Sequence, residues 1–328
     1  MDKEASFYIK KDGGKVQCVL CPMNCIIKDG KIGICRVREN RGGTLYTTIY
    51  EEVAAIHMDP IEKKPLYHFY PGSWILSVGT RGCNMSCRFC QNWDLVEAKA
   101  RGERVTAEAL VKAAIREGSI GIAYTYNEPV IWYEFIFETA ILAQKNGLKN
   151  VLVTNGFINP EPLEEILPYI DAMNIDLKAI RSPFYAEICK AKMEPVKETI
   201  KRTLGRCLIE VTNLIVTNHN DTPEEIEQLV DWVASVSPDL PLHFSRYFPD
   251  HEMTDPPTPP ETLFMAYEIA KKKLNYVYVG NYFAGEAENT YCPNCGNLLI
   301  QRRWYKTQVV GLKGRRCARC NHDIHMVN

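Results

Sequence analysis

Residues 81–94 read RGCNMSCRFCQNWD and place Cys83, Cys87 and Cys90 in a C-x3-C-x2-C run. Three thiolates on a short loop can converge on three corners of one iron–sulfur cube. No fourth cysteine stands near them in the sequence. A cube with three protein ligands keeps one iron open, and an open metal position indicates chemistry, whereas a closed one indicates structure. The spacing favours a cluster over a zinc knuckle with a distant ligand or a chance grouping.

Composition limits the classes of protein that this chain can represent. The 328 residues are 46% hydrophobic, enough for one large domain with small additions, and the net charge is −1. Such a balance argues against a surface built to hold nucleic acid or an anionic membrane. The N-terminus MDKEASFYIKKDGG has no apolar signal core, and no apolar run is long enough to span a bilayer.

Eleven of the 13 cysteines fall into three tight groups, which is typical of metal binding rather than of disulfides. An oxygen-labile cluster would need reducing conditions, so we expect a cytoplasmic protein of an anaerobe. Cys189 and Cys207 stand apart, and we expect them to be buried packing residues.

The first group lies near the N-terminus and contains Cys18, Cys21, Cys25 and Cys35, with the turn residues KDGK inside it. Four thiolates on a hairpin can close a tetrahedral zinc site. The same ligands can hold an auxiliary iron–sulfur cluster. The sequence favours zinc and leaves the cluster open.

The last group has the spacing C-x2-C, 21 residues, C-x2-C, formed by Cys292, Cys295, Cys317 and Cys320. Two knuckles on two hairpins supply four ligands with no open position, so we expect a zinc ribbon. Basic residues and the aromatic pair Trp304 and Tyr305 lie between the knuckles. This combination can bind nucleic acid, but docking on a protein is the favoured interpretation, and we expect no nucleic-acid partner.

From residue 73 onward, strand-like and helix-like segments alternate. Strands are expected at 73–79, 119–126, 149–156, 172–178, 207–216, 240–248 and 275–280, with helices between them. Repeated strand–helix units with short loops predict an α/β fold with a parallel sheet and helices outside. Six or seven units predict a partial (β/α)6-type barrel, with chemistry at the carboxyl ends of the strands. We expect three parts: a four-cysteine hairpin and strap at 1–70, the barrel at 71–285 and the ribbon at 286–328.

Residues 44–70 form the strap of this scheme. The segment carries Lys63, Lys64 and His68 shortly before the cysteine loop. Charges on a connecting segment are usually solvated, and we favour that interpretation. The alternative is that these side chains meet an anionic group of a substrate.

Polar residues stand at the ends of several predicted strands. Glu128 follows the second strand, where an acid can also simply start a helix. Thr154 and Asn155 end the third strand, before Gly156, a residue common in ordinary turns. Asp176 and Lys178 end the apolar strand NIDLK, and burying such a pair is costly unless it is paired or ligand-bound. We therefore favour a functional role for Asp176 and Lys178.

The cysteine motif, with Phe89 directly before the third cysteine, resembles that of radical S-adenosylmethionine (SAM) enzymes. The barrel is similar to pyruvate formate-lyase activating enzymes. The segments CVLCPMNC, DPIEKKPLYHFYPG, TYNEP, VGN and CPNCG resemble more closely the radical SAM member of the AmmeMemoRadiSam set. The resemblance implies a 4Fe-4S cluster whose open iron chelates the methionyl end of SAM. It also implies reductive cleavage to a 5'-deoxyadenosyl radical.

The resemblance assigns cofactor contacts to residues of this chain. Glu128 matches the glutamate of a Gly-Gly-Glu motif that meets the methionyl amino group, although Asn127 departs from that pattern. Thr154 and Asn155 match a turn near the ribose, and Asp176 with Lys178 match the Asp-Leu-Lys that approaches ribose and carboxylate. His251 ends Pro249-Asp250-His251, similar to a Pro-x-His beside the cofactor.

Taken as a whole, the resemblance implies hydrogen abstraction from a protein or peptide-like substrate, as in activating enzymes of glycyl radicals. It implies an electron donor such as ferredoxin or flavodoxin, and Memo-like and AMMECR-like companion proteins. The alternatives are radical modification of RNA or of a small molecule, and a non-catalytic metal scaffold. No feature of the sequence names the hydrogen atom removed, the fate of SAM or the oligomeric state.

Overall fold

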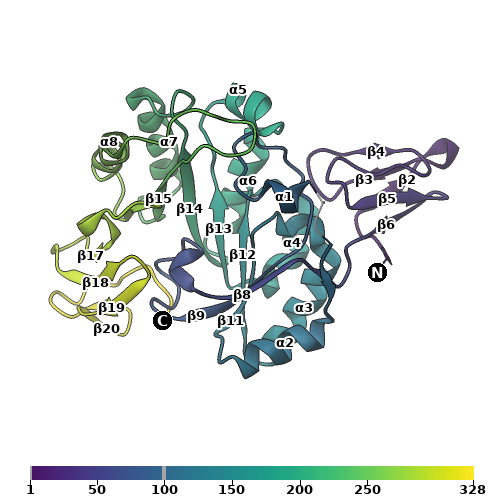
Figure 1. The fold of residues 1–328 in the computed structure, drawn as a ribbon. Helices are drawn as coiled ribbons and strands as arrows, with labels where there is room; N and C mark the ends of the chain where they lie inside the picture. The colour runs from purple at the N-terminus through teal and green to yellow at the C-terminus, as the bar shows by residue number, and fades with distance from the viewer. Residues whose placement is uncertain (1, 98–100) are drawn as a thin grey trace.

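The computed structural model describes residues 2–97 and 101–328 and is organised around an eight-stranded sheet (Figure 1). Its order is β16-β15-β14-β13-β12-β11-β9-β8. The parallel strands are β9 (Trp74–Gly79), β11 (Gly121–Tyr124), β12 (Lys149–Thr154), β13 (Ala172–Asp176), β14 (Leu208–Ile215), β15 (Leu242–Arg246) and β16 (Val277–Gly280). Each lies inside a segment predicted to be a strand, and the expectation of a mostly parallel α/β sheet is confirmed.

The principal helices connect successive strands, as the alternating pattern predicts (Figure 1). They are α2 (Ala107–Arg116), α3 (Tyr133–Lys145), α4 (Pro160–Ile166), α6 (Met193–Thr203), α7 (Pro223–Val236) and α8 (Pro260–Ala270). Thr106 and Thr222 cap α2 and α7 by accepting hydrogen bonds from backbone amides. Short elements α1 (Trp93–Val96), α5 (Ser182–Phe184) and a π-helix (Tyr185–Cys189) lie close to the site described below.

The sheet has an edge strand where the sequence predicted a strap. Strand β8 (Ala55–Pro60) pairs antiparallel with β9, from Ala55 opposite Gly79 to Pro60 opposite Trp74. Ile56 on this strand is exposed whereas Asp59 is buried, so the apolar side does not face inward throughout. The strand therefore lacks the alternation by which a half-buried strand is predicted.

Residues before β8 form two small antiparallel sheets (Figure 1). One has the order β1-β6-β5 (Lys3–Glu4, Thr44–Thr47, Arg38–Arg41), and the other β2-β3-β4 (Tyr8–Lys10, Val16–Cys18, Ile26–Ile27). Strands β3 and β4, on either side of Cys21 and Cys25, pair antiparallel within the second sheet. The four-cysteine hairpin stays a prediction. The buried guanidinium of Arg38 anchors this region to α3 through an ion pair with Glu134 at 2.5 Å. A separate two-stranded antiparallel sheet pairs β7 (Glu52–Val53) with β10 (Glu103–Arg104).

The C-terminal segment forms β17 (Thr290–Tyr291), β18 (Leu298–Arg303), β19 (Lys306–Val309), β20 (Leu312–Lys313) and β21 (Arg316–Cys317). His68 joins this segment to the sheet, because its ring nitrogens contact the Tyr278 hydroxyl at 2.6 Å and the His325 carbonyl at 2.5 Å. Arg302 also donates to the Tyr67 carbonyl at 2.7 Å. His68 and Arg302 are therefore structural residues rather than parts of an exposed charged surface. The three domain boundaries stay predictions.

Within the described residues, no helix has the length and apolar character needed to cross a bilayer.

Gly121 lies in the sheet at a position that has no space for a side chain. A Cβ there would overlap the backbone carbonyl of Lys149 on the neighbouring strand. We expect Gly121→Ala to destabilise the protein by about 1–3 kcal/mol, because β11 and β12 would have to separate. Gly280→Ala is the matched control in β16, since the nearest atom to its Cβ would be Ser245 Oγ at 3.9 Å. Thermal unfolding midpoints of the two variants check this, and equal midpoints would contradict it.

Candidate active site

An open cavity of about 550 Å³ brings together most of the predicted site residues. Its lining includes Cys83, Cys87, Cys90, Phe89, Glu128, Thr154, Asn155, Asp176 and Lys178. These side chains come from the cysteine loop after β9 and from the carboxyl ends of β11, β12 and β13. The ends of parallel strands meet at one edge of a sheet, which explains why residues so far apart in sequence converge.

The cysteine loop is held by backbone contacts with the π-helix. Ser86 N donates to the Cys189 carbonyl at 3.1 Å, and Arg88 N donates to the Ile188 carbonyl at 3.0 Å. Burial raises the pKa of the Cys90 thiol to about 11 and that of Cys83 well above its usual value. A metal bound by these thiols would displace their protons, because its ligands are thiolates.

The three sulfurs of the loop are spread more widely than the ligands of one ion. In the part of the chain that the structure describes, one group of three or more potential metal ligands has all its ligand atoms within 4.8 Å of one another. That group comprises Cys292, Cys295, Cys317 and Cys320. The sulfurs of Cys83, Cys87 and Cys90 do not meet that limit. The loop therefore does not suit a single ion, whereas a cube binds each thiolate to a separate iron.

Glu128 joins the end of β11 to the end of β12. The side chain is buried, with Oε1 accepting from Thr154 Oγ1 at 2.7 Å and from Val130 N at 2.9 Å. Its Oε2 accepts from Asn155 N at 2.7 Å. Burial raises the pKa of Glu128 to about 7, although these hydrogen bonds oppose the shift. Glu128 therefore both caps the 3-10 turn at Pro129–Trp132 and faces the cavity.

Asp176 and Lys178 form an ion pair at the end of β13. Lys178 Nζ lies 2.9 Å from Asp176 Oδ2 and 5.7 Å from the centre of the Phe89 ring. Burial alone would lower the pKa of Lys178, but Asp176 and the neighbouring thiols raise it well above its usual value. The lysine therefore stays a cation beside the cysteine loop. The Asp176 side chain is 35% exposed and has free acceptor capacity toward the cavity.

His251 lies beside the cysteine loop but does not line the cavity. Its ring stacks on Trp93, with centroids 5.4 Å apart and planes 12° apart. The next residue, Glu252, donates its backbone amide to the Arg88 carbonyl at 2.9 Å. The Pro-x-His segment thus packs on the outside of the loop, and a cofactor contact from His251 stays a prediction.

Two asparagines that the sequence did not single out as site residues, Asn84 and Asn127, hold this end of the sheet together with the predicted site residue Asn155. Asn127 Oδ1 accepts from Thr80 N at 3.0 Å and its Nδ2 donates to the Gly82 carbonyl at 2.9 Å. Asn155 Nδ2 donates to Asn84 Oδ1 at 2.9 Å. The departure from Gly-Gly-Glu at Asn127 therefore has a structural use, since this side chain fixes the start of the cysteine loop.

One side of the cavity carries charges from the segment after β8. Lys64 Nζ lies 2.7 Å from Asp59 Oδ2, the Tyr126 hydroxyl donates to the same oxygen at 2.7 Å, and Lys63 pairs with Asp59 Oδ1 at 2.9 Å. Burial works against ionisation of Asp59, but the three donors lower its pKa below the usual range. Lys63 and Lys64 line the cavity, whereas His68 does not. Of the strap's charged residues, the two lysines are therefore placed to meet a ligand.

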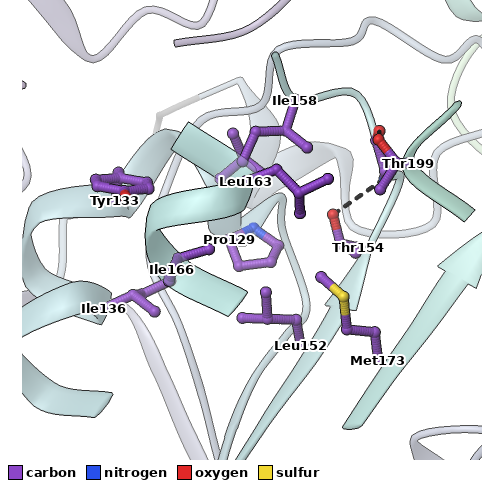
Figure 2. Close-up of a pocket in the computed structure, with 12 residues that line it drawn as sticks. Pro129, Tyr133, Ile136, Leu152, Thr154, Ile158, Leu163, Ile166, Met173 and Thr199 are labelled. Atoms are coloured by element: carbon purple, nitrogen blue, oxygen red, sulfur yellow. Dashed lines mark hydrogen bonds between the residues drawn. The ribbon is translucent and has the colours of Figure 1, made fainter. Parts of the chain in front are cut away.

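A second, apolar pocket lies next to this site (Figure 2). Leu152, Ile136, Ile166 and Met173 surround it, and Thr154 stands at its edge. Its volume of about 10 Å³ is at the lower limit for one water molecule. The pocket is therefore a small packing gap in the core rather than a binding site.

Comparison with known proteins agrees with this arrangement. The model of the Radical SAM superfamily matches residues 77–233. The protein named Uncharacterized protein MJ0808, from Methanocaldococcus jannaschii, is 46% identical over 335 residues, covering 99% of each chain. The pyruvate formate-lyase 1-activating enzyme of Escherichia coli is 27% identical over 116 residues, covering 33% of this chain and 47% of that enzyme. SuiB of Streptococcus suis, in a structure bound to S-adenosylmethionine, has a TM-score of 0.52 with 15% identity, covering 64% of this chain and 52% of SuiB.

This chain is thus an enzyme of the radical SAM superfamily. Within the superfamily it is homologous to activating enzymes of the pyruvate formate-lyase type. Membership implies a 4Fe-4S cluster and SAM, and the wide spacing of the three loop sulfurs beside a large polar cavity fits both groups.

Glu128 should make the stability of the protein depend on pH near neutrality. Its pKa rises from 4.5 to about 7 on folding, so its contribution to the free energy of unfolding is present below pH 4.5 and lost as pH rises through 7. Between pH 5 and 8, the free energy of unfolding of the wild type should fall by about 2 kcal/mol relative to that of Glu128→Gln. Unfolding midpoints measured across this range check the difference in slope, and parallel curves would contradict it. A constant offset is expected, because glutamine has one acceptor oxygen where the carboxylate has two, so the donors on one of the two oxygens lose their acceptor.

Proposed function

We propose that Cys83, Cys87 and Cys90 hold three irons of a 4Fe-4S cluster and that SAM binds in the adjoining cavity. When bound, these groups supply the reductive cleavage of SAM to a 5'-deoxyadenosyl radical, which removes a hydrogen atom from the substrate. The observation that carries the proposal is that every predicted SAM contact except His251 lines the same cavity as the cysteines.

The residues of the chain would bind and orient the cofactor. The Asp176 carboxylate is exposed to the cavity and suits a ribose hydroxyl, while the Lys178 cation suits a carboxylate. Glu128 keeps one oxygen with a single hydrogen bond, to Asn155 N, and that oxygen can accept from an ammonium group. Phe89, on the cysteine loop, lies next to Lys178.

A protein or peptide-like substrate is the proposed class. The cavity extends from the cysteine loop to Lys63, Asn281 and the half-exposed ring of Tyr305, so its rim includes the C-terminal segment. A lysine and an aromatic ring at the rim suit a peptide bearing an acidic or aromatic side chain. SuiB, which shares the fold, has also been solved with its precursor peptide SuiA bound.

The proposed partners follow from the chemistry. Reductive cleavage needs one electron from a donor such as ferredoxin or flavodoxin. Memo-like and AMMECR-like proteins are proposed companions, on the resemblance of the motifs. Zinc is the proposed ion of Cys292, Cys295, Cys317 and Cys320, whose sulfurs all lie within 4.8 Å. Because Arg302 is buried and pairs with the protein's own backbone, the ribbon offers a smaller basic surface to RNA than its sequence indicates.

The reaction can be tested by reconstituting the protein anaerobically and adding dithionite and SAM. We expect 5'-deoxyadenosine to accumulate, because one electron cleaves the sulfonium. The control is Cys83→Ala/Cys87→Ala/Cys90→Ala, which removes the three proposed ligands. A yield no higher than that of this variant would reject the proposal, and mass comparison of companion proteins with and without SAM would identify a protein substrate.

The role of Asp176 can be tested separately by steady-state kinetics. Asp176→Asn removes the negative charge facing the cavity, and we expect the KM for SAM to rise about tenfold, equivalent to about 1.4 kcal/mol. Glu161→Gln, at the exposed start of α4, is the matched control and should leave the KM unchanged. An unaltered KM in Asp176→Asn would contradict a ribose contact.

A further inference from the structure

The N-terminal cysteines surround one small enclosed space. Cys18, Cys21, Cys25 and Cys35 all line a cavity of about 20 Å³, together with Arg38, Asn84 and Ile131. Cys18, Cys21 and Cys35 are buried and Cys25 is partly buried. No disulfide joins any of these four cysteines. Four thiols that face one cavity in this way are arranged as ligands of a common group.

The spacing of the sulfurs separates two possible occupants. Zinc in a tetrahedral site has Zn–S bonds of about 2.3 Å, which place sulfurs about 3.8 Å apart and leave no space between them. The C-terminal four cysteines match this, with all sulfurs within 4.8 Å. Among the described residues, no three N-terminal sulfurs meet that limit. They line a space of about 20 Å³ and are not closed around one point as the C-terminal sulfurs are.

Arg38 supplies an independent observation. The side chain is 1% exposed, and its terminal nitrogens donate to Ser6 O at 2.9 Å and pair with Glu134 at 2.5 Å. Nη1 also lies 4.0 Å from Cys18 Sγ. Its Nε is buried with no hydrogen-bond partner. A buried donor without a partner is costly. An iron–sulfur cluster brings inorganic sulfides that can accept a hydrogen bond, whereas zinc in a four-thiolate site brings no acceptor beyond its ligands.

The cavity among the N-terminal cysteines lies next to the cysteine loop of Cys83, Cys87 and Cys90. A Cβ on Gly82 would lie 2.6 Å from the Cys35 carbonyl, so the two backbones are in close contact. Asn84 lines the N-terminal cavity and accepts a hydrogen bond from Asn155, which lines the active-site cavity. A redox group among the N-terminal cysteines would therefore be a near neighbour of a cluster on Cys83.

We propose that Cys18, Cys21, Cys25 and Cys35 bind a second iron–sulfur cluster, and that this cluster relays electrons to the active site. It accepts one electron from a low-potential one-electron donor and is oxidised again when it passes that electron to the cluster of the cysteine loop. Binding of the second cluster goes beyond the proposed function. The relay rests on that function, because it needs an acceptor at Cys83, Cys87 and Cys90.

Metal analysis tests the binding of the cluster without any activity measurement. After anaerobic reconstitution, the wild type should contain about eight irons per chain, and Cys83→Ala/Cys87→Ala/Cys90→Ala should keep about four irons and four acid-labile sulfides. On reduction, the triple variant should show the paramagnetic resonance signal of a reduced cluster. Two zincs per chain, with about four irons in the wild type and none in the triple variant, would overturn the proposal. These counts stand even where 5'-deoxyadenosine formation fails.

The relay is tested with Cys21→Ala/Cys25→Ala, which should lose about four irons and keep those of the cysteine loop. We expect 5'-deoxyadenosine formation driven by reduced flavodoxin to fall at least tenfold, while formation driven by dithionite, a small reductant that reaches the loop directly, changes less than twofold. An equal loss with both reductants, or no loss with either, would overturn the relay. Circular dichroism and the iron count of the remaining cluster verify that the variant is folded.

Discussion

The buried hydrogen bonds of Asn127 and Glu128 are the constraint on which the site depends. Asn127 holds the start of the cysteine loop through Thr80 and Gly82, and Glu128 holds the end of β12 through Thr154 and Asn155. Both side chains follow β11, between the strand that carries the loop and the strand that carries Asn155. Two adjacent residues therefore fix the distance between the cysteines and the opposite wall of the cavity. Such buried polar networks specify one geometry because an unmade bond would be costly.

Charged side chains inside the cavity are paired. Asp176 pairs with Lys178 beside the cysteine loop, and Asp59 pairs with both Lys63 and Lys64 on another side, which leaves one excess positive charge there. Burying these ions is costly, and their pairing offsets part of that cost. The partly exposed carboxylate of Asp176 retains acceptor capacity for a ligand. The cavity thus offers both a cation and a partly exposed carboxylate to a ligand that carries charges of both signs, as SAM does.

The distances between sulfurs in the folded chain distinguish cysteine groups that look alike from their spacing in the sequence. The N-terminal and C-terminal groups each offer four thiols, and by sequence both can be zinc sites. In the folded chain one group is compact and the other surrounds a cavity beside an unpaired arginine nitrogen. Cys35 lies between β4 and β5, away from the other three cysteines in sequence, and its carbonyl lies close to Gly82 of the cysteine loop.

Local patterns in the sequence determined the parallel sheet, the position of the cysteine loop and the polar residues at strand ends. Those features depend on residue periodicity, caps and short spacings, which the chain encodes over a few residues. Folding alone decided that β8 joins the sheet, that Lys64 lies buried against Asp59, and that His251 stacks on Trp93 outside the cavity. Each of these depends on contacts between residues far apart in sequence, which no local pattern records. The same reason explains why Glu128 could be found from its motif, while its bonds to Thr154 and Asn155 could not.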